Sequence, residues 1–539
     1  MLIGYVSDER YVALADVSVE FERGGESSAV ARSTPNGAIH ATIEPGAYRV
    51  TLAKPGFGPK RVTLTVPAEQ PHQFRLLSDR LLGYAWPRAV RSGESSEFKV
   101  HSVEAYRLSL WRYGWRKDFV RLLGWFDEHG PNATMQITPD GDYTQTGVHW
   151  NTVGYPQPNV TQIVAAPERS GLYYFHAEGE SGAFFSFPWV VAPATPQAPI
   201  AVLASTNTWN AYNNFGGRSN YINSTGLPLV PVVNARQDLL RYQTAGGMDV
   251  WGFPDADYPP LSFDRPEPFN HVPAETQVTD PISGRQPCHL APTEWRFLGW
   301  LEREGFAYDT YSEWQLHSGI LDLDAYRVLV ISVHPEYWSR AMFDRVQAWV
   351  QQRGGHLLYL GGNGVNCEVE FLDNATLHFK TYRGSAEEQG ATGQGLDSRF
   401  HRIGESEAAL LGVAFSYAGI MTAAPYRVVR EHWTLAGTGL QVGDIFGQAS
   451  LHERISGGAS GHETDKRTAN SPAGTILLAK GLNPDNGGAE MVYYETASGG
   501  AVFSVGSITY VASLLVDPAV SRITSNVLTR FLDRGDSAS

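Results

Sequence analysis

The chain has 539 residues, a formal net charge of -14 at pH 7 and two cysteines. A single hydrophobic core stops growing at about 250–300 residues, so a chain of this length should form more than one domain. The acidic balance argues against binding to nucleic-acid phosphates or to an anionic membrane surface.

The sequence also indicates a compartment. No apolar run approaches the roughly 20 residues that span a bilayer, and charged residues follow Leu2 too soon for a signal peptide. Cys288 and Cys367 could pair, but two cysteines are too few for a disulfide scaffold or a thiolate zinc site, and we expect two reduced, buried thiols. We therefore expect a cytoplasmic protein that neither binds nucleic acid nor enters a membrane.

Residues 1–80 have the pattern of a small all-β module. Short strand-like segments, such as Val17–Phe21, Ala38–Ile43 and Tyr48–Leu52, are separated by Pro-Asn-Gly and Pro-Gly turns. The order of these segments resembles the carboxypeptidase-regulatory-like, or transthyretin-like, β-sandwich. In that family the module is usually a passive accessory, so we assign it no chemistry.

Residues 81–194 continue the β pattern. Strand-like segments at Glu97–His101, Tyr106–Tyr113 and Gly171–Ala177 predict a second sandwich, of the immunoglobulin-like kind. The Pro-rich segment Ala192–Pro199 is predicted to be a linker, because prolines cannot donate to a central β-ladder.

The pattern changes in residues 195–539. Strand-like runs now alternate with amphipathic stretches at Glu294–Glu304 and Ser339–Arg353, and a terminal helix is expected over Val520–Leu532. This alternation predicts an α/β domain. The Gly-rich segment Ser456–Asn470 is predicted to be a long polar loop, and such loops in compact domains are often functional.

Three predicted strands of this domain end in polar residues. Val328–Val333 is a β-branched, apolar run with the length of a buried parallel strand, and His334 and Glu336 follow it. Pro199–Thr206 continues into Asn-Thr-Trp-Asn-Ala-Tyr-Asn-Asn, and Gly355–Leu360 continues into Gly-Gly-Asn-Gly. Ligands bind at the carboxyl ends of strands in open parallel sheets, so the three exits predict one shared pocket.

Several common chemistries are excluded by their motifs. The sequence has no G-x-S-x-G elbow, no H-E-x-x-H and no G-K-[ST] phosphate loop. Cys288 lies in a Pro-rich segment and Cys367 lies beyond a predicted strand end, so neither fits a glutaminase nucleophile at a strand-to-helix elbow. The candidate chemistry that remains is a site built mainly from oxygen-bearing side chains.

Four motifs of the third region bring a known family to mind. Thr208–Asn214 (TWNAYNN), His334–Trp338 (HPEYW), Gly361–Gly364 (GGNG) and Gly461–Asp465 (GHETD) together resemble the large subunit of N,N-dimethylformamidase and its homologues. The resemblance covers about residues 198–531 and the sandwich before them. It implies a class I glutamine-amidotransferase-like α/β fold that lacks the catalytic cysteine. It also implies hydrolysis of small amides at a mononuclear iron held by two tyrosines and one glutamate.

The same resemblance implies which residues hold the iron. Tyr212 would supply the first phenolate and Glu336 the carboxylate. Tyr258, shortly before an Arg-Pro pair, is the best match for the second phenolate, with Tyr221 or Tyr242 as alternatives. A phenol with a pKa of about 10 stays ionised at neutral pH only beside a strong hard cation, which Fe3+ supplies better than Mg2+ or Zn2+. Such an ion keeps open positions for a water and an amide carbonyl.

Three further residues are implied as catalytic. His334 and Asn363 would orient the carbonyl or stabilise its oxyanion, and Glu463 would move a proton from water to the leaving amine. Each also has an ordinary interpretation, as a structural histidine, a left-handed turn residue and a solvated acid. Likewise, Tyr212 could be a packing residue and Glu336 a cap of the following helix.

The sequence thus predicts an iron-dependent amidohydrolase that acts on a small N-substituted amide. We also expect a homo-oligomer, and a separate small subunit is a candidate partner because the characterised relatives use one. Two rivals stay open: a non-catalytic protein that binds a carbohydrate or peptide, and a metal-free hydrolase on the same scaffold. Colour separates them, since charge transfer from phenolate to Fe3+ absorbs visible light.

Overall fold

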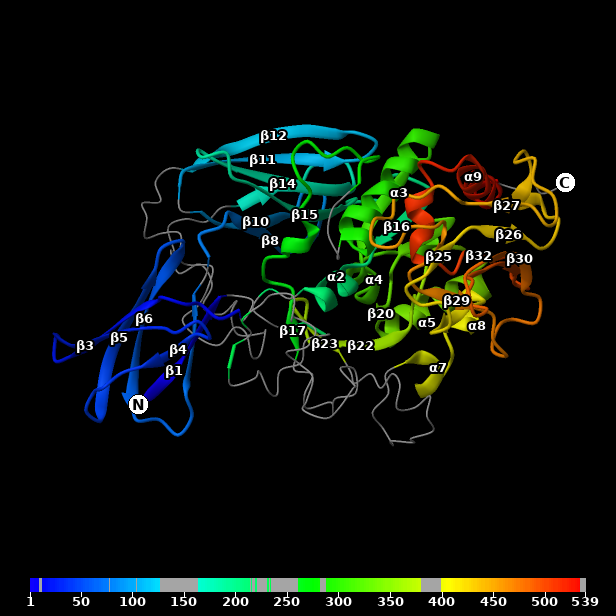
Figure 1. Ribbon diagram of the computed structural model, residues 1–539. Helices are drawn as coiled ribbons and strands as arrows, with labels where there is room; N and C mark the ends of the chain where they lie inside the picture. Colours follow the sequence, from blue (N-terminus) through cyan, green and yellow to red (C-terminus); the bar gives the residue numbers. More distant parts are fainter. Residues whose placement is uncertain are drawn as a thin grey trace.

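The protein is mainly β-sheet, with the N-terminal module at one end and the C-terminal helix near the other (Figure 1). The computed structural model describes residues 1–8, 12–76, 78–102, 104–126, 163–213, 215, 219–220, 230–231, 233, 260–281, 287–379 and 399–533.

The first region packs a three-stranded sheet, in the order β4-β1-β7, against a four-stranded sheet, in the order β3-β2-β5-β6. Alternation along each strand builds the core: Tyr48, Val50 and Leu52 point inward from β5, while the residues between them are more exposed. The strands are β1 Leu2–Asp8, β2 Ser18–Arg23, β3 Glu26–Arg32, β4 Ala38–His40, β5 Gly46–Lys54, β6 Phe57–Val66 and β7 His72–Leu76.

The second region is again sandwich-like. A three-stranded sheet, β13-β10-β8, faces a five-stranded sheet, β12-β11-β14-β15-β9. Aromatic side chains fill the space between them, with Phe175 stacked on Phe187 and Trp189 buried beside it. The strands are β8 Leu82–Trp86, β9 Ala89–Arg91, β10 Ser95–His101, β11 Tyr106–Tyr113, β12 Lys117–Phe126, β13 Ile163–Ala165, β14 Gly171–Gly179 and β15 Phe184–Ala192.

The third region is built on a nine-stranded sheet, in the order β18-β16-β19-β21-β32-β31-β30-β26-β27. The first five strands are parallel to one another and the remaining pairs are antiparallel. The strands are β16 Ile200–Ala204, β18 Tyr308–Ser312, β19 Val328–Val333, β21 His356–Gly361, β26 Tyr426–Val428, β27 Ile445–Phe446, β30 Ile476–Gly481, β31 Glu490–Glu495 and β32 Ala501–Ser504.

Helices cover both faces of the parallel half. Val328 and Val330 of β19 belong to the same hydrophobic cluster as helices α3 Ala291–Glu304 and α9 Pro518–Leu532. Leu329 and Ile331 point the other way and pack with α5 Arg340–Arg353. A strand buried on both faces needs apolar residues at every position, which explains the uninterrupted apolar run of β19.

Short elements connect these layers. A four-stranded sheet has the order β17-β23-β22-β20, β24 pairs with β29, and β25 pairs with β28. The strands are β17 Leu261–Ser262, β20 Tyr337–Trp338, β22 Cys367–Phe371, β23 Thr376–Phe379, β24 Ala414–Ser416, β25 Ala423–Ala424, β28 Ser460–Gly461 and β29 Thr464–Lys466. The helices are α2 Thr206–Tyr212, α4 Glu313–His317, α7 Phe400–Ile403 and α8 Ala408–Leu411, with 3-10 turns η4 Pro268–Asn270, η5 Pro287–His289, η6 Leu323–Ala325, η7 Trp433–Leu435 and η8 Ile508–Ser513.

The structure confirms the predicted strands at Tyr106–Tyr113 and Val328–Val333. The prediction of an uninterrupted loop at Ser456–Asn470 is wrong, because β28 and β29 lie within it and pair with distant strands. Two sandwich-like regions before a sheet with a parallel half agree with the coarse fold class. The immunoglobulin-like and amidotransferase-like assignments, and the boundaries at residues 80 and 194, stay predictions.

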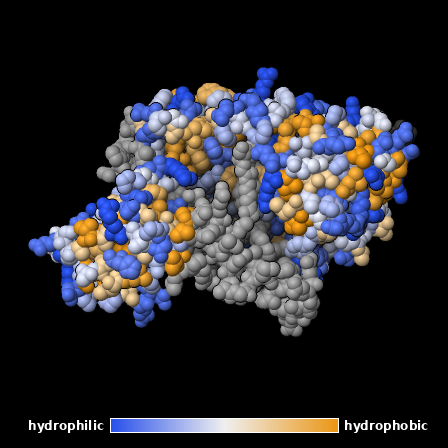
Figure 2. Space-filling model, in the orientation of Figure 1, coloured by the Kyte–Doolittle hydropathy of each residue, from blue (hydrophilic) through white to orange (hydrophobic). Residues whose placement is uncertain are grey.

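The two cysteines, Cys288 and Cys367, are both buried and are not joined by a disulfide. In the part of the chain that the structure describes, no helix is both long and apolar enough to cross a bilayer. On the face shown in Figure 2, hydrophobic residues are interspersed with hydrophilic ones.

One buried histidine of the second region gives a pH-dependent prediction. His176 lies in β14, with Nε2 2.7 Å from the Tyr113 hydroxyl and its ring stacked on Trp111. Burial, and then the charge of Lys117, lowers the pKa of His176 to about 3. An unfolded histidine has a pKa of about 6.5, so the unfolded chain binds more protons between these values and stability falls as the pH drops through this window.

Because of His176, we expect the free energy of unfolding to be roughly 2–3 kcal/mol lower at pH 4.5 than at pH 7.5. Replacement by a residue that does not titrate, as in His176→Gln, should shrink the difference between denaturant melts at the two pH values by that amount. His40→Gln, at an exposed histidine, is the control. An equally steep pH dependence in His176→Gln would contradict the prediction.

Candidate functional site

The carboxyl ends of three neighbouring parallel strands meet at one edge of the nine-stranded sheet. The strands β16, β19 and β21 are adjacent in the sheet, and the chain leaves the last two at His334 and Gly362. The loop with Glu463 reaches the same edge, since a Cβ atom added to Gly362 would lie 2.5 Å from the carbonyl oxygen of Glu463. Only glycine permits this close approach of two backbones.

Asn363 links the two carboxyl groups at this edge. Its Nδ2 donates to Glu336 Oε1 at 3.2 Å and to Glu463 Oε2 at 2.8 Å. Its backbone is left-handed, with φ of 51°, so the predicted turn is present together with the side-chain contacts. The structure therefore brings together three of the residues singled out from the sequence.

His334 lies between the same two carboxyl groups. Its Nε2 is 3.2 Å from Glu336 Oε2 and 3.3 Å from Glu463 Oε2, and the side chain is buried. Burial alone would lower the pKa of His334, but the charges of Glu336 and Glu463 outweigh it and raise that pKa to about 10. Neither contact has the geometry of a well-formed hydrogen bond. Among the described residues, neither ring nitrogen of His334 has a hydrogen-bond partner.

His334, Glu336, Asn363 and Glu463 form the site cluster. Glu463 is its most open member, since its side chain is 15% exposed, against 4% for Glu336 and 1% for His334. Burial alone would raise the pKa of the Glu463 carboxyl. The charge of His334 and the hydrogen bond from Asn363 outweigh burial, so the pKa lies below its ordinary value. Most of the side chain is enclosed, so Glu463 is not the solvated loop acid of the ordinary interpretation.

Left-handed backbone conformations gather around this edge. Val333, Asn363, Val365 and His462 have φ of 63°, 51°, 52° and 65°. For a β-branched residue this conformation is an outlier that costs on the order of 1–3 kcal/mol and persists only where surrounding contacts enforce it. Such residues cluster at functional sites, and here they set the directions in which His334 and Glu463 leave the backbone.

A buried network fixes the Asn363 turn from behind. Asp465 Oδ1 accepts the backbone N–H of Asn363 at 2.8 Å, and its Oδ2 accepts the Tyr359 hydroxyl at 2.6 Å. The same hydroxyl accepts the backbone N–H of Gly364 at 2.7 Å. Burial raises the pKa of Asp465 to about 7. Asp465 therefore ties the segment that carries Glu463 to the turn that carries Asn363.

Helix α2 brings Tyr212 to the same place. The Tyr212 ring centroid lies 4.6 Å from that of His289 and 5.7 Å from that of His334. One turn earlier, Thr208 Oγ1 accepts the backbone N–H of Glu336 at 3.1 Å. The helix thereby joins two of the three strand exits.

Tyr258, and the alternatives Tyr221 and Tyr242, lie outside the described residues. Glu336 is not the cap of the following helix, because the side chain of Ser339 caps α5 by accepting the backbone N–H of Met342.

Sequence reasoning missed four residues that the structure places here. Asp465 and His462 stand in the GHETD motif, but only its glutamate was assigned a role. Thr208 stands in the TWNAYNN motif, where only the tyrosine was assigned. His289 carried no signal except its place beside Cys288.

The donor set fits a hard cation. Glu336 offers a carboxylate oxygen and Tyr212 a phenol oxygen, which are the ligand atoms that such ions prefer. Two carboxyl groups face one imidazole within the described residues, so a bound cation would balance an excess of negative charge. The buried and unpartnered Asn363 Oδ1 shows that further polar contacts are open there.

A second cluster does not fit a metal. Ligand atoms of Cys288, His452 and His462 lie within 4.8 Å of one another. A ligating histidine normally donates its other ring N–H to an acceptor. Here His452 Nδ1 accepts the backbone N–H of Ile455 at 3.2 Å, and Arg454 Nη1 lies 3.2 Å from His462 Nε2. Both outer nitrogens therefore face donors, which is the wrong arrangement for ligation.

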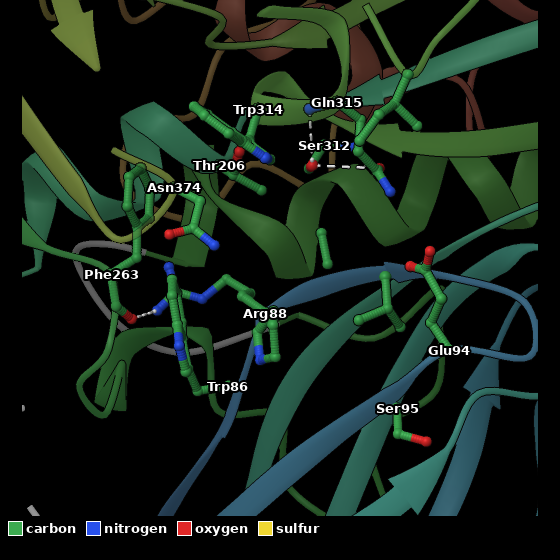
Figure 3. Close-up of a pocket in the computed structure, with 14 residues that line it drawn as sticks. Trp86, Arg88, Glu94, Ser95, Thr206, Phe263, Ser312, Trp314, Gln315 and Asn374 are labelled. Carbon is green, nitrogen blue, oxygen red and sulfur yellow. Dashed lines mark hydrogen bonds between the residues drawn. The ribbon is translucent and has the colours of Figure 1, made fainter. Parts of the chain in front are cut away.

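A cavity of about 290 Å³ lies elsewhere, between the second sandwich and the third region (Figure 3). Trp86 and Arg88 from the sandwich side and Phe263 and Trp314 from the other side are among its lining residues. Among the described residues, none of those singled out from the sequence as catalytic or metal-binding lines it.

Comparisons with known proteins agree on one family. A family model described as N,N-dimethylformamidase beta subunit-like, C-terminal, matches residues 107–522. The N,N-dimethylformamidase beta subunit of Paracoccus aminophilus is 28% identical over 285 residues, which are 45% of this chain and 37% of that protein. The protein of the same name from Alcaligenes sp is 25% identical over 470 residues, which are 71% of this chain and 58% of that protein. Each match spans less than two thirds of the relative.

Solved structures add little. The major pilin subunit of Bacillus cereus matches with a TM-score of 0.14 and 11% identity, over 38% of this chain and 72% of that chain. A likeness of that size carries no argument about the fold.

Proposed function

The chain belongs to the N,N-dimethylformamidase beta subunit-like family, and from this premise we propose that it hydrolyses a small N-substituted amide to a carboxylic acid and an amine. The family resemblance seen in the sequence is thereby confirmed. The match begins at residue 107, so the resemblance of the N-terminal module to a transthyretin-like sandwich stays a prediction. The proposed scaffold is the amidotransferase-like α/β arrangement expected from the sequence.

One observation carries the proposal. The carboxamide of Asn363 and the imidazole of His334 each contact the carboxyl groups of both Glu336 and Glu463. These groups come from three separate segments: His334, Glu336 and Asn363 follow the carboxyl ends of parallel strands, where ligands bind in such sheets, and Glu463 reaches them from the segment between β28 and β29. Buried acid, base and amide groups in one place are typical of a hydrolytic site.

A mononuclear Fe3+ completes the proposed site. Tyr212, Glu336 and a second tyrosine would hold it, with Tyr258 as the first choice and Tyr221 or Tyr242 as alternatives. When bound, the ion supplies Lewis-acid polarisation of the amide carbonyl and activation of a water.

The residues around the proposed iron site would carry the proton transfer, hold the water and stabilise the carbonyl oxygen. Glu463 accepts a proton from the attacking water and returns it to the nitrogen as the carbon–nitrogen bond breaks, a role that its more open side chain supports. Asn363 Oδ1 has no hydrogen-bond partner in the described part of the chain, and it accepts from that water and holds it beside Glu463. His334 donates to the carbonyl oxygen as negative charge develops there.

A separate subunit is a further part of the proposal. Both curated relatives are named beta subunits. A partner subunit of this chain is therefore proposed, together with assembly into a homo-oligomer.

The function is tested on protein expressed with iron in the medium. We expect a yellow to brown protein with about one iron per chain, and hydrolysis of at least one member of a panel from formamide to dimethylformamide and small lactams. Amine release is measured by a coupled assay. Colourless, iron-free protein that still cleaves amides would favour a metal-free hydrolase, and protein without any amidase activity would favour a binding protein.

Tyr212→Phe tests the phenolate assignment. The change removes one phenolate donor and keeps the ring beside His289 and His334, so the visible band should weaken or shift while the protein stays folded. Tyr173→Phe is the matched control, because its hydroxyl donates to the carbonyl oxygen of Arg169 in the second sandwich and is not proposed as a ligand. An unchanged absorption spectrum in Tyr212→Phe would exclude Tyr212 as a ligand.

A further inference from the structure

A further buried imidazole lines the site. His289 ends the short turn η5 just before α3 and is only 1% exposed. Its ring centroid lies 4.6 Å from that of Tyr212, 5.5 Å from that of His334 and 5.2 Å from that of His462. The ring therefore stands among the residues at the strand exits, although it comes from a different part of the chain.

The two nitrogens of His289 differ in their surroundings. Nδ1 lies 3.4 Å from Cys288 Sγ, whereas Nε2 is buried without a hydrogen-bond partner among the described residues. Burial raises the pKa of the Cys288 thiol to about 12, so the sulfur carries its proton. A thiol sulfur is a weak acceptor and an imidazole nitrogen is a good one, so the Cys288 S–H donates to His289 Nδ1. Nε2 then carries the ring proton.

An N–H left without an acceptor in a buried site is costly unless a ligand accepts from it. The ring nitrogens of His334 are likewise buried without a hydrogen-bond partner among the described residues, and so is an acceptor, Asn363 Oδ1. The set combines nitrogen donors with an oxygen acceptor. A neutral amide and a water molecule match that combination, because the amide carbonyl accepts from N–H groups and the water donates to an oxygen.

We propose that His289 is a catalytic residue that donates its Nε2–H to the carbonyl oxygen of the amide substrate, as the second donor beside His334. This inference rests on the proposed amide hydrolysis for its catalytic part. Preorganised N–H donors aimed at the oxygen on which negative charge develops form an oxyanion site, and they are most valuable when water is excluded. Cys288 then has a positioning role, since its thiol sets which nitrogen of His289 carries the proton.

The experiment compares two replacements of His289. Glutamine places an amide N–H close to the position of Nε2, whereas asparagine reaches only the position of Nδ1. We expect His289→Asn to lower kcat about 10²–10³-fold with the iron content unchanged, and His289→Gln to stay within about 10-fold of wild type. His452→Asn, in a histidine two rings away, is the control and should hydrolyse the amide at nearly the wild-type rate.

Cys288 provides a second pair of variants, for which we expect smaller effects on the rate. Cys288→Ser keeps a donor to His289 Nδ1, and Cys288→Ala removes it. The serine variant should be the faster of the two. Equal rates would show that the thiol does not set the tautomer.

Binding is measured apart from turnover with dimethyl sulfoxide, which offers an acceptor oxygen and two methyl groups but cannot be hydrolysed. Calorimetric titration should show affinity roughly 3–10-fold weaker in His289→Asn than in wild type. Wild type that binds this probe through His289 yet cleaves no amide would overturn the proposed function and leave the contact intact. Unchanged kcat and unchanged probe affinity in folded His289→Asn would overturn the inference, as would equal losses in the asparagine and glutamine variants.

Discussion

The Glu336→Gln protein should fold but retain little iron, and it should hydrolyse amides more than about 10²-fold more slowly than wild type. Glutamine keeps the size of the side chain and an oxygen that can accept from Asn363 Nδ2. It removes one of the two negative charges beside His334, and with it a ligand that balances the cation. Loss of a residue that only supports a ligand typically costs 10–100-fold, and loss of a ligand costs more.

Elemental analysis of the purified variant, together with kcat/KM on the best amide of the panel, decides this prediction. Glu368→Gln is the matched control, because Glu368 accepts two hydrogen bonds from Arg340 outside the cluster. A folded Glu336→Gln protein with full iron occupancy would show that Glu336 is not an essential ligand.

The Glu463→Gln protein should keep its iron and its colour yet turn over roughly 10²–10⁴-fold more slowly, since this is the typical contribution of general acid–base catalysis. Glutamine can still accept the hydrogen bond from Asn363, but it cannot carry a proton between water and the leaving amine. The expected pattern of intact metal and lost turnover separates a proton carrier from a ligand.

Single-turnover and steady-state rates of Glu463→Gln measure the effect. Glu490→Gln serves as the control, because Glu490 accepts the backbone and side-chain N–H groups of Arg467 and takes no part in the cluster. If Glu463→Gln works at the wild-type rate, the proton transfer must be assigned to His334.

The parts of the fold that could be predicted are those in which local pattern and burial agree. Val328–Val333 is apolar at every position because helices cover both faces of its sheet, and its bounds follow from the sequence. Strands such as β26 and β27, with three and two residues, are too short to show a period. They form because distant strands supply their partners. Helix α2 has only seven residues, and its beginning at Thr206 was hidden in a predicted strand end.

The same distinction holds within the site. His334, Glu336 and Asn363 follow predicted strands, so the sheet topology itself brings them together. His289 reaches the site through a short 3-10 turn, and tertiary packing places its ring beside Tyr212. Asp465 acts by accepting a backbone N–H, a contact that has no side-chain signature in the sequence.

The left-handed backbone of Val333 matters for anyone who wishes to engineer this protein. Glycine or asparagine would relieve a conformation that valine adopts only under constraint, but Val333 is fully buried in the core, so either change also loses the packing of its side chain. The same relief would loosen the direction in which His334 leaves the strand. Attempts to raise heat resistance should therefore leave this residue alone and use surface positions of the two sandwiches instead.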